Sequence, residues 1–237
     1  MEDLKSSTLA QIVTSNYRAA VVFEQYNIDF CCKGKRTLGQ ACSEKGIEWA
    51  VMEQALARSG ATRENEVNEV VLGMTPGELT MYIEQNHHRY VREEMPLIEG
   101  YLLKLATKHG DRHPELYEVL SNFSDIKDEL GPHMKKEEMV LFPRIREAEQ
   151  QSVLTGAAKF DTAYLGGPIH VMETEHDVAG TLMANIRKIT SDYAVPADGC
   201  TTYKLCYASL HAFEIDLHRH VHLENNVLFP KAMKLVK

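Results

Sequence analysis

The stretch HMKKEEMVLFP at residues 133–143 returns as HVHLENNVLFP at residues 220–230. Both copies begin with a His, carry a Glu four residues later and end in Val-Leu-Phe-Pro. In an α-helix, residues four apart lie on the same face, about one turn from each other. Each copy therefore presents one imidazole and one carboxylate on a single face of a helix.

A further His precedes each copy at a matched distance. His88 lies 45 residues before His133, and His176 lies 44 residues before His220. The repeat indicates two helical hairpins, each with a lone His on its first helix and the His-x-x-x-Glu pair on its second. Two such hairpins, related by a pseudo-twofold axis, bring both sets of side chains to the middle of one bundle.

The rest of the chain predicts an all-α protein. Apolar residues recur at three- and four-residue intervals, without the alternation of strands. We predict a small helical N-terminal domain with a Cys-Cys pair, a polar linker and an up-down-up-down four-helix bundle, at residues 1–57, 58–75 and 76–237. The bundle helices are expected at 76–108, 113–150, 168–190 and 200–235, with Thr75 capping the first, Pro76 opening it, and residues 162–168 as a loop.

Composition excludes several classes of function. The 237 residues have 44% hydrophobic side chains, enough for a buried core, and a formal net charge of -8. This acidic balance argues against nucleic acid and anionic membrane surfaces as partners. The N-terminal stretch does not resemble a signal peptide, and no apolar run is long enough to span a bilayer. We therefore expect the five cysteines to be reduced thiols in the cytoplasm.

Helical spacing places six polar residues inside the apolar stripes of the bundle helices. The stripe of the first helix is expected to include Met81, and that of the second Val140. The six polar residues are His88, His133, Glu137, His176, His220 and Glu224.

Buried carboxylates without partners lose several kcal/mol of hydration free energy, so this set requires a compensating charge. Four imidazoles and two carboxylates suit iron, manganese or zinc. Two metal ions use the set symmetrically, with two His on each ion, both Glu and an oxygen as bridges, and one coordination position left open. A single His-x-x-x-Glu pair is more often structural, but two copies in the same context favour metal binding.

The other histidines and the repeated proline have structural interpretations. His218 and His222 lie about 200° around the helix from the stripe and are expected to face solvent. His87, His109, His113 and His170 are expected to be structural or exposed. Pro143 and Pro230 lack an N–H and are expected to kink or end their helices just beyond the ligand-bearing turn.

The paired motifs resemble those of hemerythrin-like four-helix domains. The fifth His of oxygen-carrying hemerythrins is not found in the stripe, which implies a more open or differently occupied iron site than that of a pure oxygen carrier. YNIDFCCKGKRTLGQAC (residues 26–42), GPIHVMETEHDVAG (residues 167–180) and the second repeat also resemble the di-iron RIC family, for repair of iron centres. This resemblance covers nearly the whole chain.

The resemblance implies a cofactor of two non-haem iron ions with an oxo or hydroxo bridge. The six stripe residues match the family's ligands, with Glu137 and Glu224 as the bridges. Glu129 and Glu175 match carboxylates near the site. Glu129 lies one turn before His133, where a role in orienting that ligand or in iron exit is expected.

The resemblance further implies repair of iron–sulfur clusters damaged by nitrosative or oxidative stress, by iron donation to the damaged enzymes. Two alternatives remain open at this point: a di-iron nitric oxide reductase or scavenger, and a hemerythrin-like sensor or carrier of O2 or nitric oxide. Whether the protein is an enzyme therefore stays open. A cytoplasmic location is implied, and a homodimer is compatible with the family.

Cys31 and Cys32 are candidate reactive residues. The nearby Lys33, Lys35 and Arg36 can lower a thiol pKa by stabilising thiolate, which suits transient iron capture, reaction with nitric oxide or thiol redox chemistry. The alternative is a structural turn with one buried and one exposed Cys, and residue chemistry alone does not separate the two. The family resemblance favours the functional interpretation.

Overall fold

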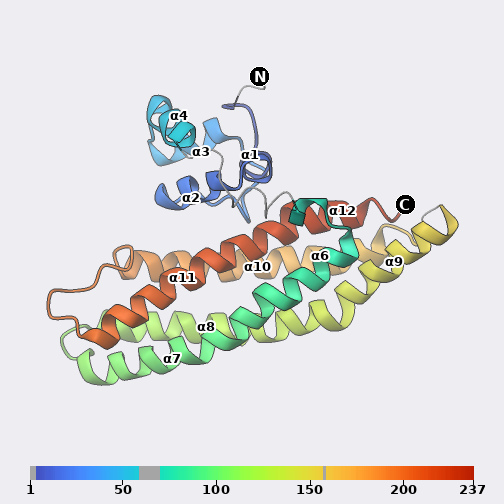
Figure 1. Cartoon of the computed structure of the whole chain (residues 1–237). Helices are drawn as coiled ribbons and strands as arrows, with labels where there is room; N and C mark the ends of the chain where they lie inside the picture. The colour runs from blue at the N-terminus through green and yellow to red at the C-terminus, as the bar shows by residue number, and fades with distance from the viewer. Residues whose placement is uncertain (1–3, 59–69, 157–158) are drawn as a thin grey trace.

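The computed structural model describes residues 4–58, 70–156 and 159–237, and within these ranges the chain is helical. The only β-type pairing among the described residues is an isolated bridge between Thr8 and Thr37. The all-α prediction is therefore confirmed, and Figure 1 shows a cluster of short helices beside a bundle of long ones.

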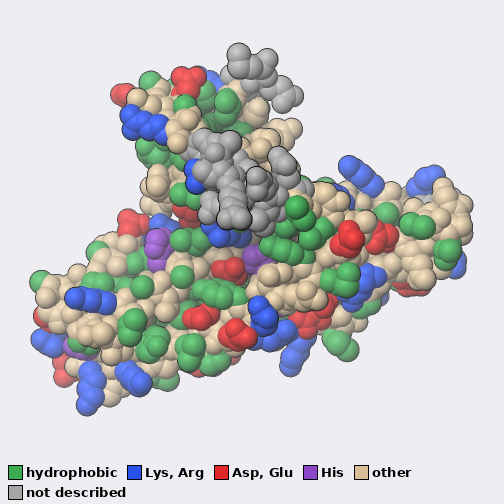
Figure 2. All heavy atoms as spheres, in the orientation of Figure 1, with side chains coloured by type: hydrophobic (Ala, Val, Ile, Leu, Met, Phe, Trp, Pro, Cys, Tyr) green, Lys and Arg blue, Asp and Glu red, His purple; other side chains and the backbone are tan. Residues whose placement is uncertain are grey.

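Four short helices form the N-terminal unit. They are α1 (Leu9–Ser15), α2 (Arg18–Gln25), α3 (Leu38–Lys45) and α4 (Trp49–Arg58). A Thr-x-x-Gln capping box starts both α1 and α3, where the Thr and Gln side chains satisfy free N–H groups of the first turn. In Figure 2 this unit stands as a separate lobe on one side of the bundle.

Successive helical segments of the bundle run in opposite directions (Figure 1). The first bundle helix is α6 (Pro76–Ile83), η1 (Glu84–His88) and α7 (Arg89–His109); the second is α8 (Glu115–Lys136), η2 (Glu137–Leu141) and α9 (Phe142–Thr155). The third is α10 (Ala163–Ile189), and the fourth is α11 (Thr201–Leu223), η3 (Glu224–Leu228) and α12 (Phe229–Met233). The segments η1, η2 and η3 are π-helical turns.

The observed start of the first bundle helix agrees with the prediction from the sequence, whereas the start of the third does not. Thr75 caps α6 and Pro76 opens it, as predicted. The third bundle helix, however, begins at Ala163, so residues 162–168 are not the expected loop. Leu165 is fully buried there. Its packing holds turns that the local Gly-Gly-Pro sequence disfavours, because burial in tertiary structure outweighs local helix propensity.

The apolar core of the bundle is divided in two. One cluster joins the N-terminal unit to the half of the bundle built from α7, α8, α11 and the end of α10. The other packs α6, α9, α12 and the start of α10. The boundary between the two clusters is a layer of buried polar side chains.

Two sequence predictions concern the surroundings of the bundle. Most of the expected linker falls on residues 59–69, which lie outside the described residues, while residues 70–73 are helical. Among the helices that the structure describes, none combines the length and apolar character needed to cross a bilayer.

Candidate metal centre

Six polar side chains form one layer across the bundle, and each is at most 1% exposed. They divide into two overlapping groups whose ligand atoms lie within 4.8 Å of one another. Position 1 contains His88 and His220, position 2 contains His133 and His176, and both contain Glu137 and Glu224. The structure thus brings together all six residues that the spacing selected.

Each carboxylate lies between histidines of the two positions. Glu137 Oε2 is 3.2 Å from Nε2 of His88 and 3.4 Å from Nε2 of His133. Glu224 lies 3.0 Å from Nε2 of His220 through Oε1, and 3.0 Å from Nε2 of His176 through Oε2. Both glutamates therefore stand where a carboxylate can bridge two neighbouring cations.

Several of these buried atoms lack a hydrogen bond. Nε2 of His88, both carboxylate oxygens of Glu137 and Oε2 of Glu224 have no hydrogen-bond partner among the described residues. Leaving a buried polar atom unsatisfied costs about 1–3 kcal/mol, and more for a charged one. The unsatisfied atoms point into the same layer, so a bound cation would satisfy them together. The donor set of imidazole nitrogens and carboxylate oxygens fits iron, manganese or zinc.

The layer also shifts the pKa values of its members. Burial lowers the pKa of His88, but the adjacent carboxylates raise it more, to about 10. The balance is similar for His133, whose pKa rises to about 9. The neighbouring histidines lower the pKa of Glu137 and Glu224, despite burial and the repulsion between the two carboxylates. Without metal, two imidazolium groups therefore balance two carboxylates.

Three π-helical turns carry ligand residues into the layer. The turn η1 ends at His88, η2 begins at Glu137 and η3 begins at Glu224. A π turn inserts one residue into the helical register, which rotates the helix by about 100° relative to an uninterrupted one. The prediction was therefore wrong for Met81 and Val140, which are 46% and 41% exposed. Their buried neighbours Ile83 and Leu141 face the core instead.

The π turns also explain the repeated proline. Pro143 and Pro230 follow η2 and η3 directly, in the first turn of α9 and α12, and neither ends its helix. The helix beyond Pro143 continues to Thr155. Because the π turn changes the hydrogen-bond register, a residue without an N–H is tolerated next to it, and the predicted helix end was wrong.

Three of the four histidines hold their ring through a second hydrogen bond. Nδ1 of His88 donates to Glu138 at 2.7 Å, and Nδ1 of His133 donates to Glu175 at 2.9 Å. Nδ1 of His176 donates to the side-chain oxygen of Asn225 at 2.9 Å. Such partners fix the orientation of a metal-binding ring and raise its basicity.

Sequence reasoning found only part of this second set. Glu175 contacts a ring as expected, whereas Glu129 is exposed on the surface of α8. Glu138 and Asn225 were missed, because each lies off the apolar stripe of an ideal helix. One signal was present: each directly follows the Glu of a His-x-x-x-Glu motif.

Cys31 and Cys32 lie between α2 and α3, against the bundle. The Cys32 thiol donates to the backbone oxygen of His176 at 3.6 Å, and the Cys31 carbonyl accepts from Asn226 at 3.0 Å. The pKa of Cys31 is raised well above its usual value by its hydrogen bond to Cys32, by burial and by Asp29. The expected lowering of the thiol pKa is therefore wrong for Cys31.

The basic residues that suggested a lowered pKa point elsewhere. Arg36 pairs with Glu44, and Lys35 lies 3.6 Å from Glu173 of α10. Cys31 is buried and Cys32 is partly exposed. On exposure alone, the pair agrees with the structural alternative.

Two histidines expected to face solvent are covered by the N-terminal unit. His222 is 2% exposed, and its ring centroid lies 5.6 Å from that of Phe30. His218 donates to Glu24 at 2.6 Å. The helix face opposite the ligands is thus buried by a second unit, which periodicity within one helix cannot reveal.

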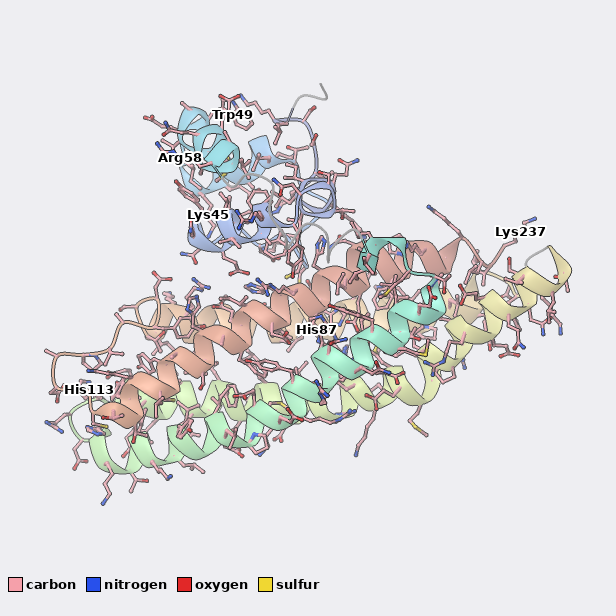
Figure 3. All side chains as sticks on the ribbon, viewed as in Figure 1. Lys45, Trp49, Arg58, His87, His113 and Lys237 are labelled. Atoms are coloured by element: carbon pink, nitrogen blue, oxygen red, sulfur yellow. The ribbon has the colours of Figure 1, made fainter. Side chains whose placement is uncertain are left out.

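His87 is also buried, at 7% exposure, and Figure 3 shows it near the middle of the bundle. Its Nδ1 donates to Asp216 at 3.0 Å. Its ring lies parallel to that of His220, with centroids 5.4 Å apart.

The fold and the site together define a helical-bundle cation-binding protein whose buried His and Glu side chains form two overlapping groups able to hold a metal ion. Residues 82–232 match the hemerythrin HHE cation binding domain, and residues 5–59 match the ScdA_N domain, a domain of unknown function. The chain is 33% identical over 230 residues to the iron-sulfur cluster repair protein YtfE of Musicola paradisiaca, covering 97% of both chains.

The proteins of the same name from Enterobacter sp. and Shigella boydii are each 33% identical to the chain, which again covers 97% of both sequences. The chain therefore belongs to the hemerythrin HHE family, in the branch of the iron-sulfur cluster repair proteins YtfE. The family resemblance inferred from the sequence motifs is confirmed.

Proposed function

We propose that this protein repairs damaged iron–sulfur clusters by donating iron from a buried centre of two non-haem iron ions joined by an oxo or hydroxo bridge. The supporting observation is the layer of six buried ligands, with unsatisfied atoms directed at two adjacent positions. Relatives matched over 97% of the chain are named iron-sulfur cluster repair proteins. The proposed ligands are His88, His133, Glu137, His176, His220 and Glu224, with both glutamates as bridges.

An iron donor must remain folded after it has given up its metal. The pKa values of His88 and His133 in the metal-free layer meet this requirement, because both rings take up a proton at neutral pH. Two positive charges then replace the cations beside Glu137 and Glu224. Loss of iron is thereby coupled to proton uptake, which avoids two uncompensated buried carboxylates.

The route for iron passes the rim of the layer in this proposal. Glu138 and Glu175 have side chains 24% and 20% exposed, and each accepts a hydrogen bond from a ligand ring. Each also pairs with a surface cation, Arg92 or Lys136. Carboxylates that contact both the layer and the surface can pass a cation outward. Exposed Glu129, on the same bundle helix as Glu138, is proposed to receive the cation further along this route.

The thiol pair is proposed to assist this transfer. Ligand atoms of Asp29, Cys31 and Cys32 lie within 4.8 Å of one another and can hold a cation. Cys31 and Cys32 line a cavity of about 190 Å³ that also reaches Asp177 and Asn225. Replacing both thiols with Ser should then slow iron transfer without lowering bound iron, whereas Cys200→Ser, at an exposed thiol, should change neither.

The proposed partners are iron–sulfur enzymes damaged by nitric oxide or O2, with these small molecules as ligands of the centre. All five cysteines are free thiols, which supports a reducing compartment such as the cytoplasm. A two-domain organisation is supported by the separate domain matches at residues 5–59 and 82–232. We further propose a homodimer, which light scattering can test.

The test is reactivation of a nitric-oxide-damaged aconitase by the iron-loaded protein, with iron counted on both proteins afterwards. Recovery of activity with movement of iron is expected. Glu137→Gln should abolish bound iron and repair, while Glu118→Gln, at an exposed site on the same helix, should preserve both. Repair that persists without the metal centre would refute the proposal.

The same assay separates the alternatives. Nitrous oxide formed over many turnovers would identify a nitric oxide reductase. Reversible binding of O2 or nitric oxide, without turnover or iron loss, would identify a sensor or carrier.

A further inference from the structure

We propose that the two metal positions are unequal and that position 1, at His88 and His220, gives up its ion first because His87 takes the carboxylate that would orient His220. This inference rests on the proposed metal centre. It does not depend on which protein receives the iron.

The histidines of the two positions differ in how their rings are held. At position 2, both rings donate from Nδ1, His133 to Glu175 and His176 to Asn225. At position 1, only His88 does so, to Glu138. Nδ1 of His220 is buried and has no hydrogen-bond partner among the described residues. One ligand of position 1 is therefore free to rotate about its side-chain bonds at lower cost than the other three.

A carboxylate stands one helical turn from this unpartnered nitrogen. Asp216 precedes His220 by four residues in α11, and a helical side chain lies over the turn before its own Cα. Asp216 Oδ1, however, accepts from Nδ1 of His87 at 3.0 Å, and its Oδ2 is buried without a hydrogen bond. Asp216 therefore bonds to His87, while Nδ1 of His220 and Oδ2 of Asp216 both lack a hydrogen-bond partner among the described residues.

His87 reaches this place through the π turn η1, which ends at His88. Its ring lies parallel to that of His220, at an interplanar angle of 6°, and so supports the ligand by stacking alone. Stacking restricts tilt of the ring but leaves Nδ1 without an acceptor. His87 is therefore a positioning residue that weakens one ligand.

Position 2 is additionally tied to the N-terminal unit. The thiol of Cys32 donates to the backbone oxygen of His176, and Asn226, next to the ring partner Asn225, donates to the Cys31 carbonyl. These contacts brace the segment around His176. The asymmetry therefore leaves position 2 as the retained site and position 1 as the source of the first ion.

The experiment follows iron release from the fully loaded protein into excess chelator, under anaerobic conditions. Two phases of equal amplitude are expected, separated by roughly 10–100-fold, the usual effect of an orienting partner on metal affinity. In His87→Phe the stacked ring is kept and Asp216 is free to accept from His220. The rate of the fast phase should then fall towards that of the slow phase. The control His211→Phe, at an exposed site on α11, should leave both phases unchanged.

The assignment to a position is read from the metal itself. Crystals exposed to chelator for a time between the two phases should show anomalous scattering at position 2 and none at position 1. A single release phase, faster release in His87→Phe, or residual metal at position 1 would overturn the inference. If release and scattering follow the expectation while aconitase stays inactive, the inference stands and the proposed donor function fails.

Discussion

Glu138→Ala is expected to weaken metal binding at position 1 while leaving position 2 occupied. Glu138 accepts from Nδ1 of His88 at 2.7 Å and from Arg92 at 2.6 Å, with its side chain 24% exposed. Losing an orienting partner of this kind typically reduces metal affinity by 10–100-fold, or about 1.4–2.7 kcal/mol. Because His220 has no such partner, both rings of position 1 would then be free to rotate.

Two milder variants calibrate this effect. Glu138→Gln keeps an oxygen acceptor for His88 and should cost less than Glu138→Ala. Arg92→Ala removes only a half-exposed ion pair, worth about 0.2–1 kcal/mol, so affinity should fall by less than about sixfold. The graded order of the three variants follows directly from the contacts of Glu138.

The assay is competitive titration against a chromophoric chelator, with thermal unfolding by circular dichroism as the control for folding. Asn225→Ala is the mirror variant, because it removes the ring partner of His176 and should weaken position 2. Glu138→Ala that binds two ions with wild-type affinity, or that loses the ion at position 2 first, would refute the reasoning.

Three further predictions address charge, stability and domain contact. Loading two metal ions at pH 7 should release about two protons, because His88 and His133 have metal-free pKa values of about 10 and 9. Metal affinity should therefore rise with pH up to about 10 and fall in acid, as calorimetry in buffers of different ionisation enthalpy can measure. Glu214→Ala should cost about 1–3 kcal/mol of unfolding free energy, seen as a lower denaturation midpoint, because Arg187 and Tyr193 lose their shared buried acceptor. Glu24, Asn27 and Asp192 still contact the guanidinium, and an unchanged midpoint would contradict this prediction. In Gly34→Ala the added methyl would lie 2.5 Å from the backbone oxygen of Phe30 and 2.9 Å from the side chain of Asn226 in the fourth bundle helix. This clash should loosen the contact between the N-terminal unit and the bundle, so the Cys-Cys pair should be alkylated faster. Alkylation at the wild-type rate would count against tight packing of the two units.

Helical periodicity was sufficient to select the six buried polar residues of the layer, because a polar residue within an apolar stripe is costly unless its charge is compensated. It failed at two of the three π turns, η1 and η2. Met81 lies before the π turn η1 and Val140 lies within the π turn η2, and the extra residue of each turn rotates them into solvent. The sequence repeat marks where two of these turns occur, but a π turn has no composition of its own.

Contacts between units were beyond the reach of a single-helix argument. His222 was expected to face solvent because its own helix points it away from the ligands, yet Phe30 covers it. The raised pKa of Cys31 likewise depends on its hydrogen bond to Cys32, on burial and on Asp29, not on the basic residues that follow it in sequence. Both errors arise from contacts that form only in the folded protein.

The division of the bundle core into two apolar clusters has a consequence for how the protein opens. Each half has its own tightly packed interior, and the boundary between them contains few apolar contacts. Local opening in native proteins follows such boundaries. Amide protons of η2 and η3 should therefore exchange with solvent sooner than those of α7 or α10, and metal loading should slow their exchange selectively. The polar layer at the centre of the bundle would then open locally while the apolar cluster on each side stays folded.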